Sequence, residues 1–429
     1  MSASRSRSAP ERALAPAALS PTDPIRMLPR PVVDGHLGHV DRYGPRPAAE
    51  ARLIDEIDAA GLRGRGGAGF PTATKLRAVA SRGRRPVVVA NGTEGEPASA
   101  KDKVLLGAAP HLVLDGVELV ADLLGASEVF LCVDRNWPDV SLAVERARDQ
   151  RPRTARRRLQ VLDAPDRYVA GEETALVHWI NGGEAKPTFV PPRPFERGVR
   201  GRPTFTSNVE TYAQIGLIAR FGADWYRALG TTAAPGTTLL TVTGGVAQPG
   251  VCEAPGGSSM SSVIAAAGGA VDGVQAVLVG GYFGTWIPGS AVDSVSLDPA
   301  SLSGYGASLG CGVLAVLGDH VCPLVEVARV ARWLAGQNAG QCGPCVHGLP
   351  AVADSLEWAV SGNPVTASQI GGLVELVKGR GACKHPDGMA RFVESSVRVF
   401  GDHLAQHRRH GPCPTHHPVL PVPETGTWR

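Results

Sequence analysis

Apolar residues in the first half of the chain fall into short runs that alternate with longer amphipathic stretches. Residues 86–90 (PVVVA) form a continuous apolar run that ends at the turn-like pair Asn91-Gly92, as a buried parallel strand does. Residues 127–134 predict a second strand. Three amphipathic stretches predict helices around these strands: 48–62, 111–126 and 140–150. This alternation favours an α/β domain, which we place at residues 46–235.

The pattern changes twice after this domain. Residues 237–257 predict two short strands joined by a Gly-Pro turn, and a short helix and a further strand follow before residue 284. From residue 322 onward, helical spacing returns in four consecutive stretches, which predict a small bundle. Residues 31–47 are expected to be an irregular lead-in. We therefore expect a disordered N-terminal extension, an α/β domain, a β-rich domain, a helical domain and a tail: residues 1–45, 46–235, 236–300, 301–410 and 411–429.

Composition agrees with a folded, multidomain chain. Of 429 residues, 43% are hydrophobic and 19% are charged, so a sizeable core can form although the chain has 53 glycines and 35 prolines. The net charge of +3 is too balanced to indicate a nucleic-acid partner, and the basic run 146–159, which lacks interleaved aromatic residues, is interpreted as a solvated face. No apolar run reaches the roughly 18 residues of a spanning helix, and the N-terminus lacks the apolar region of a secretory signal. We expect a soluble, cytoplasmic protein without direct membrane insertion.

A glycine-rich stretch carries the first candidate chemistry. Residues 61–76 contain Gly64-x-Gly66-x-x-Gly69, but a predicted helix precedes them, which argues against the dinucleotide fingerprint that follows a strand. The glycines would still let the backbone approach an anionic ligand closely, and Lys75 in the next helix would add a positive charge. A tight packing loop is the alternative.

Acidic and amide residues follow in three further segments. Glu94 and Glu96 come directly after the first strand, at the sheet edge where ligands of α/β proteins gather, and either accept hydrogen bonds from ligand hydroxyls or form an ordinary acidic turn. Residues 168–183 (YVAGEETALVHWINGG) place carboxylates at the start of a helix, which capping alone would explain. Asn208 and Glu210 precede another predicted helix.

Three of the eight cysteines are spaced as metal ligands are. Cys342-Gly-Pro-Cys345 begins the helical domain and Cys383 follows it, whereas a thioredoxin-like dithiol would follow a strand. Three thiolates make an incomplete four-cysteine site for an iron–sulfur cluster or for zinc. The histidine-rich stretch 403–417 is interpreted as a solvated tail, with metal binding as the alternative. Four other cysteines are interpreted as core residues: Cys132, Cys252, Cys311 and Cys322.

In their order and spacing, these segments resemble the F subunit of respiratory complex I (NADH-quinone oxidoreductase), the 51-kDa FMN- and NADH-binding flavoprotein family. The resemblance covers about residues 48–400 and rests on four stretches that match family motifs: GLRGRGGAGFPT, NGTEGEP, GEETAL and RPTFTSNVET. It implies an FMN-binding α/β domain, then a β-grasp (SLBB-like) domain, then a C-terminal helical bundle that carries a [4Fe–4S] motif.

The resemblance also implies roles for individual residues. In the family, NADH passes a hydride to the flavin, so no side chain is expected to be a catalytic acid or base. NADH would contact Phe70, Glu96 and Glu173, and the cluster would be bound by Cys342, Cys345 and Cys383. FMN would be held by the glycine-rich loop, its lysine, the acidic segments and the asparagine segment: Gly64, Gly66, Gly67, Lys75, Asn91, Glu94, Gly171, Glu172, Glu173, Ser207 and Asn208.

Departures from the family motifs concern both the nucleotide and the cluster. Thr93 replaces an aspartate and Ser207 replaces an asparagine. Ala339 occupies the first position of the family's Cys-Gly-x-Cys-x-x-Cys motif, so a fourth cluster ligand would come from elsewhere, or the cluster would be three-iron, labile or absent. The replaced positions on the adenine side are Ala78, Val190 and Arg193. The candidates for the fourth ligand are hydroxide, an exogenous group, His347, His385 and Cys413.

The resemblance implies flavin-dependent electron transfer. NADH would be oxidised at FMN, and electrons would pass through the iron–sulfur cluster to a ferredoxin-like or thioredoxin-like iron–sulfur partner subunit or to a quinone-reducing complex docked at the membrane. The alternative is an NADH-independent electron-transfer or assembly subunit in which the nucleotide site has degenerated. A structural protein without a cofactor is the third hypothesis.

Overall fold

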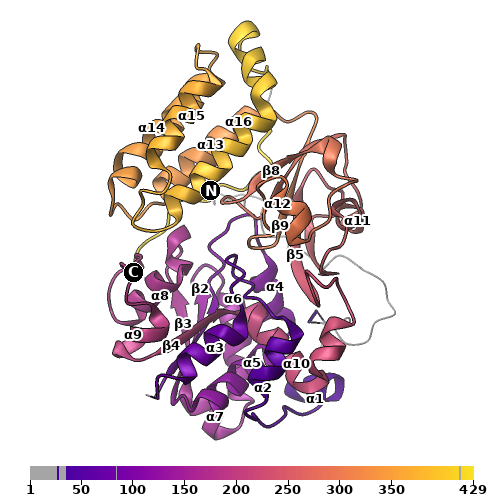
Figure 1. The fold of residues 1–429 in the computed structure, drawn as a ribbon, viewed down its shortest axis with the longest axis vertical. Helices are drawn as coiled ribbons and strands as arrows, with labels where there is room; N and C mark the ends of the chain where they lie inside the picture. The colour runs from indigo at the N-terminus through magenta and orange to yellow at the C-terminus, as the bar shows by residue number, and fades with distance from the viewer. Residues whose placement is uncertain (1–26, 29–34, 84, 415–416) are drawn as a thin grey trace, which may run out of the picture.

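The computed structural model describes residues 27–28, 35–83, 85–414 and 417–429. An α/β unit lies at one end of the long axis and a helical bundle at the other, with a second sheet beside their junction (Figure 1). Residues 1–26 and 29–34 of the predicted disordered extension 1–45 lie outside the described residues.

A four-stranded parallel sheet organises the first unit. Its strands lie in the order β3 (Leu159–Ala164), β2 (Glu128–Asp134), β1 (Val87–Gly92) and β4 (Thr204–Asn208). Two 3-10 turns lie in its loops: η1 (Tyr168–Gly171) and η2 (Val199–Gly201). Its helices are α1 (Gly35–Tyr43), α2 (Leu53–Ala60), α3 (Thr72–Ala80), α4 (Lys101–Ala108), α5 (Pro110–Leu124), α6 (Pro138–Asp149), α7 (Arg153–Arg158), α8 (Glu173–Ile180), α9 (Pro194–Arg197) and α10 (Val209–Arg227).

The central strand β1 is buried on both faces. Val88 and Ala90 join the main core with α5 and α10, whereas Val87 and Val89 pack on the other side with residues of α8. A strand covered on both faces has no solvent side, which explains the uninterrupted apolar run in its sequence.

The second unit is a five-stranded mixed sheet. Its strands lie in the order β6 (Gly250–Pro255), β5 (Thr237–Gly244), β9 (Val313–Gly318), β7 (Val274–Val279) and β8 (Thr285–Pro288). Its short helices are α11 (Met260–Ala266), η3 (Gly289–Ala291) and α12 (Pro299–Ser303). Val277 and Val279 of β7 face the core that contains α11, whereas Ala276 and Leu278 face the helical bundle. The sheet therefore packs against the bundle on one face and against α11 on the other.

The third unit is the predicted helical bundle. It contains α13 (Pro323–Gly336), the π-helical turn η4 (Pro344–Gly348), α14 (Leu349–Val360), α15 (Ala367–Val377) and α16 (His385–His410). Residues 417–429 contain no helix or strand but run back along the molecule. The backbone N–H of Leu420 donates to Glu326 at 2.7 Å, and the carbonyl oxygen of Trp428 accepts a hydrogen bond from the N–H of Ala185 at 2.9 Å. This segment thus connects the bundle with the α/β unit instead of forming a free tail.

Two expectations about element boundaries are wrong. Residues 35–43 form helix α1 where an irregular lead-in and a disordered extension were expected, because His39 is held by Asp115 of α5, with 2.7 Å between imidazole Nε2 and the carboxylate. The second sheet does not end by residue 300, because β9 pairs with both β5 and β7. Strand β9 therefore belongs to the sheet although it lies in the predicted helical segment 301–410.

Helices α5 and α10 approach each other closely at Gly116. A Cβ atom on Gly116 would lie 1.8 Å from the carbonyl oxygen of Tyr212, and a Cβ atom on Gly216 would lie 3.2 Å from that of Leu112. Only glycine permits such an approach of two backbones.

By length and composition, no single described helix is suited to crossing a membrane, and the one pair of helices that meets these criteria together, α4 and α5, is bent by 94°.

Replacing Gly116 by alanine is expected to lower the free energy of unfolding by about 3 kcal/mol, because the added methyl group must displace the backbone of α10. Gly107→Ala in α4 is the matched control, since nothing lies within 4 Å of its Cβ position, and it should be neutral or stabilising by up to about 1 kcal/mol. Urea denaturation followed by circular dichroism measures both effects. Equal unfolding midpoints for the two variants would contradict this packing.

Candidate functional site

A cavity of about 590 Å³ opens at the carboxyl ends of β1 and β4. Ligand sites of parallel α/β sheets lie at this edge. All three units contribute to the lining, through residues 65–68, 91–102, 168–172, 280–284, 308–311 and 383–385. A neighbouring cavity of about 320 Å³ shares the glycine-rich loop with it.

Most of the predicted cofactor residues lie around these two cavities. Gly64 lines the smaller one. Phe70, Lys75, Glu173 and Ser207 line neither. The residues that line the larger cavity are Gly66, Gly67, Asn91, Glu94, Glu96, Gly171, Glu172 and Asn208.

The glycine-rich loop is held in place by its own arginine. The Arg65 guanidinium donates to the Tyr226 hydroxyl at 2.9 Å and to the carbonyl oxygen of Thr237 at 3.1 Å, while its backbone N–H donates to Thr211 at 2.9 Å. Gly67 has φ of +107°, a conformation that L side chains rarely adopt. The loop is therefore fixed against α10 and β5, and its glycine backbone borders both cavities.

The two asparagines are oriented by neighbouring backbone and by one carboxylate. Asn91 and Asn208 are direct partners in the parallel register of β1 and β4. The Asn91 amide donates to the carbonyl oxygen of Gly171 at 2.8 Å, and Thr93, which replaces the family's aspartate, donates its hydroxyl to Asn91 at 2.8 Å. The Asn208 amide donates to Asp102 at 2.6 Å. Both side chains thus reach the cavity in defined orientations.

Glu94 serves mainly to cap a helix. Its carboxylate accepts hydrogen bonds from the backbone N–H groups of Asp102 and Lys103, at 3.0 and 3.1 Å, at the start of α4. The Ser99 hydroxyl also donates to it, at 2.5 Å. Burial, assisted by the Asp102 carboxylate, raises the pKa of Glu94 to about 7.

Glu96 joins the α/β unit to the second sheet. Its carboxylate accepts hydrogen bonds from the backbone N–H of Tyr282 at 2.7 Å and from the hydroxyl of Tyr168 at 3.0 Å. Gly281 must lack a side chain, since a Cβ atom there would lie 2.5 Å from Glu96. Burial raises the pKa of Glu96 to about 7.

A buried ion network behind the asparagines was not anticipated. Lys101 is 2% exposed, and its ammonium lies 2.6 Å from Asp102, 3.0 Å from Glu210 and 3.1 Å from the Asn208 side chain. Burial alone would lower the pKa of Lys101, but Asp102 and Glu210 outweigh it and raise the pKa. The sequence contains one sign of this network, the adjacent residues Lys101 and Asp102 at the end of the acidic segment. Charged side chains that are buried are almost always paired with other groups.

Two residues predicted to bind ligands form an ion pair with each other in this structure. The Lys75 ammonium lies 2.9 Å from the Glu173 carboxylate and donates to the carbonyl oxygen of Thr206 at 2.7 Å. Glu172 caps α8 by accepting hydrogen bonds from the N–H groups of Thr174 and Ala175. The sequence-based alternative of helix capping therefore describes Glu172 in this structure.

The cysteine motif lies close to the cavity. Cys383 lines it, and Cys345 is buried at η4. His385 also lines it; Nε2 lies 2.8 Å from the carbonyl oxygen of Leu334, while the buried Nδ1 has no hydrogen-bond partner among the described residues. With Nε2 as the donor, Nδ1 carries a lone pair, so His385 fits the role of fourth ligand better than exposed His347 does.

Two interpretations of cysteine and histidine residues are wrong. Cys413 is not available as a fourth cluster ligand, because its sulfur lies beside His403 and His407 of α16. Cys322 is a buried core residue, as predicted, and its sulfur also belongs to the same group. Cys311 packs partly buried against the core and also lines the cavity. His403 and His407 therefore lie in folded helix, not in a solvated tail.

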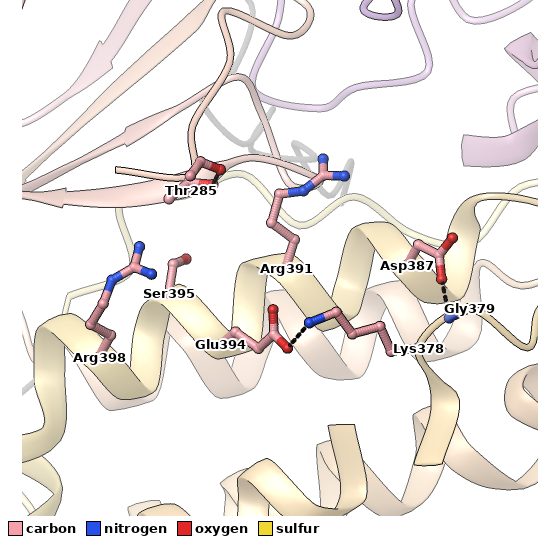
Figure 2. A pocket seen from close by; sticks show the side chains of 9 residues that line it. Thr285, Lys378, Gly379, Asp387, Arg391, Glu394, Ser395 and Arg398 are labelled. Atoms are coloured by element: carbon pink, nitrogen blue, oxygen red, sulfur yellow. Dashed lines mark hydrogen bonds and ion pairs between the residues drawn. The ribbon is translucent and has the colours of Figure 1, made fainter. Parts of the chain in front are cut away.

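A further cavity of about 410 Å³ lies beside α16 (Figure 2). Lys378 pairs with Glu394 at 2.6 Å, and Asp387 accepts the backbone N–H of Gly379 at 2.7 Å. Arg391 lines this cavity and also the larger one. None of the predicted cofactor residues borders it, so the cavity at the strand ends is the better candidate.

Comparisons with known proteins agree with this arrangement. Three family models match in sequence order: the Nuo51 FMN-binding domain at residues 57–217, the SLBB domain at 239–281 and the NADH-ubiquinone oxidoreductase-F iron-sulfur binding region at 326–407. They confirm the predicted fold class and cofactor set, and they favour an iron–sulfur cluster over zinc for the three-cysteine motif.

Relatives match over most of their length. The F subunit of NADH-quinone oxidoreductase from Mycobacterium bovis is 30% identical over 408 residues, which cover 87% of this chain and 90% of that protein. The F subunit numbered 2 of the same enzyme from Rhizobium meliloti is 28% identical over 420 residues, 92% of this chain and 100% of that protein. The crystal structure of an NAD+-reducing [NiFe]-hydrogenase in the H2-reduced state superposes with a TM-score of 0.77 at 30% identity, covering 88% of this chain and 70% of that one.

The raised pKa values of Glu94 and Glu96, about 7 against an ordinary 4.5, predict a pH dependence of stability. Between about pH 4.5 and pH 7, the folded state binds more protons than the unfolded state does. The stabilising free energy that these two protonated carboxyl groups contribute is therefore complete below about pH 4.5 and is lost as the pH rises through about 7. Glu96→Gln stays uncharged, so its unfolding midpoint should change less between about pH 5 and pH 8 than that of the wild type. Glu424→Gln, at an exposed position, should leave the pH profile unchanged. An unaltered slope in Glu96→Gln would contradict the assignment.

Proposed function

Since the chain belongs to the family of NADH-quinone oxidoreductase F subunits, we propose that it oxidises NADH at an FMN held at the carboxyl ends of β1 and β4. Electrons would leave through an iron–sulfur cluster bound by Cys342, Cys345 and Cys383. The observation that carries this proposal is that Cys383 lines the same cavity as the glycine-rich loop and both asparagines. Flavin and cluster would then lie side by side.

The residues around the cavity suit a flavin nucleotide. The volume of about 590 Å³ is within the usual range for cofactor sites, roughly 300–1,000 Å³. Gly66 and Gly67 present backbone without side chains, and the buried Lys101 donates a hydrogen bond to Asn208 at 3.1 Å, which fixes that side chain. When bound, FMN supplies a hydride acceptor that can release electrons one at a time. The chain's own part is to bind, orient and exclude water.

The nucleotide would enter over the exposed side of the loop. Phe70 is 53% exposed and offers an aromatic face beside the glycines. Glu96 and Glu173, the other predicted nucleotide contacts, are engaged by Tyr282 and Lys75 respectively. These two carboxylates already have partners within the chain, and residues on the adenine side of the family's nucleotide site are replaced. Both observations favour the second candidate function, an NADH-independent electron-transfer or assembly subunit.

We place the electron exit at η4. Cys345 is buried there, while Val346 is 49% exposed and His347 is exposed on the adjoining surface. A ferredoxin-like or thioredoxin-like iron–sulfur subunit docked on this turn would receive the electrons, within a larger complex docked at a membrane. Reduced ligand thiols and the use of NADH favour the cytoplasm.

An anaerobic visible spectrum of the flavin- and iron-loaded protein, recorded before and after NADH, tests the proposal. We expect flavin bands that NADH bleaches. Gly67→Ala should lower FMN affinity about tenfold, because a side chain at a φ of +107° strains the loop by about 1–2 kcal/mol. Gly83→Ala, also at positive φ but with nothing within 4 Å, should retain the flavin.

The outcomes separate the two candidate functions. Flavin bands that NADH leaves unchanged, with a ferredoxin-type donor bleaching them, would establish the NADH-independent alternative. Absence of flavin binding in both the wild type and Gly83→Ala would overturn the proposed function itself.

Restoring a cysteine at position 339 should stabilise the cluster. Ala339 occupies the position of the missing family ligand and is 8% exposed. Ala339→Cys is therefore expected to slow iron loss on exposure to air several-fold relative to the wild type. Ser361→Cys, which adds a thiol at an exposed helix end, is the control and should lose iron as the wild type does. Equal iron loss in all three proteins would show that the fourth ligand already comes from another residue.

A further inference from the structure

Two cysteines and two histidines converge near the end of α16, outside the cavity described above. Cys322 caps the start of α13, His403 and His407 lie one turn apart on α16, and Cys413 follows that helix. Their four ligand atoms all lie within 4.8 Å of one another. None of the three cysteines of the iron–sulfur motif belongs to this group.

The distances within the group match one tetrahedral ion. The Cys322 sulfur lies 3.7 Å from His403 Nε2 and 3.5 Å from His407 Nε2, and the Cys413 sulfur lies 3.4 and 3.3 Å from the same two atoms. A Zn²⁺ ion with Zn–S of about 2.3 Å and Zn–N of about 2.0–2.1 Å separates tetrahedral sulfur and nitrogen ligands by about 3.5 Å. Donors that converge on one point suit a single ion, whereas the ligands of a cubane cluster surround a larger body.

The surrounding contacts orient the ligands toward such an ion. His407 Nδ1 lies 3.2 Å from the carbonyl oxygen of Val360, which fixes the proton on Nδ1 and leaves the Nε2 lone pair directed at the sulfurs. Cys322 immediately precedes α13, so its sulfur lies near the N-terminus of that helix.

We propose that Cys322, His403, His407 and Cys413 form a structural Zn²⁺ site. Two thiolates balance the charge of the ion, and two thiol protons are released when it binds. Four protein ligands complete a tetrahedral site and leave no open position, so the ion has a structural and not a catalytic role.

The position of the site explains what the ion would stabilise. Cys413 precedes the segment 417–429, which binds Glu326 of α13 and then Ala185 of the α/β unit. Cys322 and α16 both belong to the bundle. The ion therefore fastens the beginning of this connecting segment to the two helices over which it passes.

Metal analysis of the purified full-length protein tests the site. We expect about one zinc per chain that survives dialysis, in addition to iron, and a tenfold or greater loss of zinc in Cys413→Ser and in His403→Asn. His410→Gln removes an exposed histidine of the same helix and should keep zinc. Cys342→Ser should lose iron and keep zinc, which separates this site from the cluster.

X-ray absorption at the zinc edge of the wild type covers the case in which the ligand variants do not fold. Two sulfur and two nitrogen neighbours are expected, at about 2.3 and 2.0–2.1 Å. Four sulfur neighbours would place the zinc at another site and overturn the proposal, as would a wild-type protein that takes up no zinc when Zn²⁺ is added during refolding. Retention of zinc in folded Cys413→Ser would overturn it equally.

Discussion

Charged groups that are almost fully buried where the three units meet must be compensated by other groups of the chain. Lys101, Asp102 and Glu210 satisfy one another behind the two asparagines, and Glu96 accepts hydrogen bonds from the second sheet and from η1. Removing one member would leave another buried and unpaired, at a cost of several kcal/mol. The shape of the cavity therefore depends on this polar network as much as on the apolar cores around it.

The same network explains which parts of the site could be predicted from the sequence. The positions of the glycine-rich loop, Asn91 and Asn208 follow from strand ends and helix starts, which local patterns show well. The partners of the acidic side chains do not, because Glu96 meets Tyr282 and Lys75 meets Glu173 only after distant segments have packed. A carboxylate near a predicted ligand site can equally be a helix cap or a contact between units.

Features of the fold can likewise be divided into those that local sequence patterns predict and those that depend on contacts between distant segments. The apolar run of β1 and the amphipathic helices are local signals, whereas α1 depends on the contact of His39 with Asp115, and β9 depends on pairing with two strands from earlier in the chain. The metal-binding group was visible only in part: His403 and His407 show the one-turn spacing of helical ligands, but nothing local relates them to Cys322, which starts another helix.

The segment 417–429 has a consequence for the order of events during synthesis. The backbone N–H of Thr427 donates to Asp166, a residue 261 positions earlier in the chain. At about 5–20 residues per second, Asp166 leaves the ribosome some 10–50 s before its partner does. During that interval, the surface that Trp428 later covers is exposed to solvent. This surface includes the Arg167 guanidinium, which lies 4.3 Å from the centroid of the Trp428 ring in the folded protein. A nascent α/β unit that folds during this interval must therefore do so without the contacts that Thr427 and Trp428 later make with it.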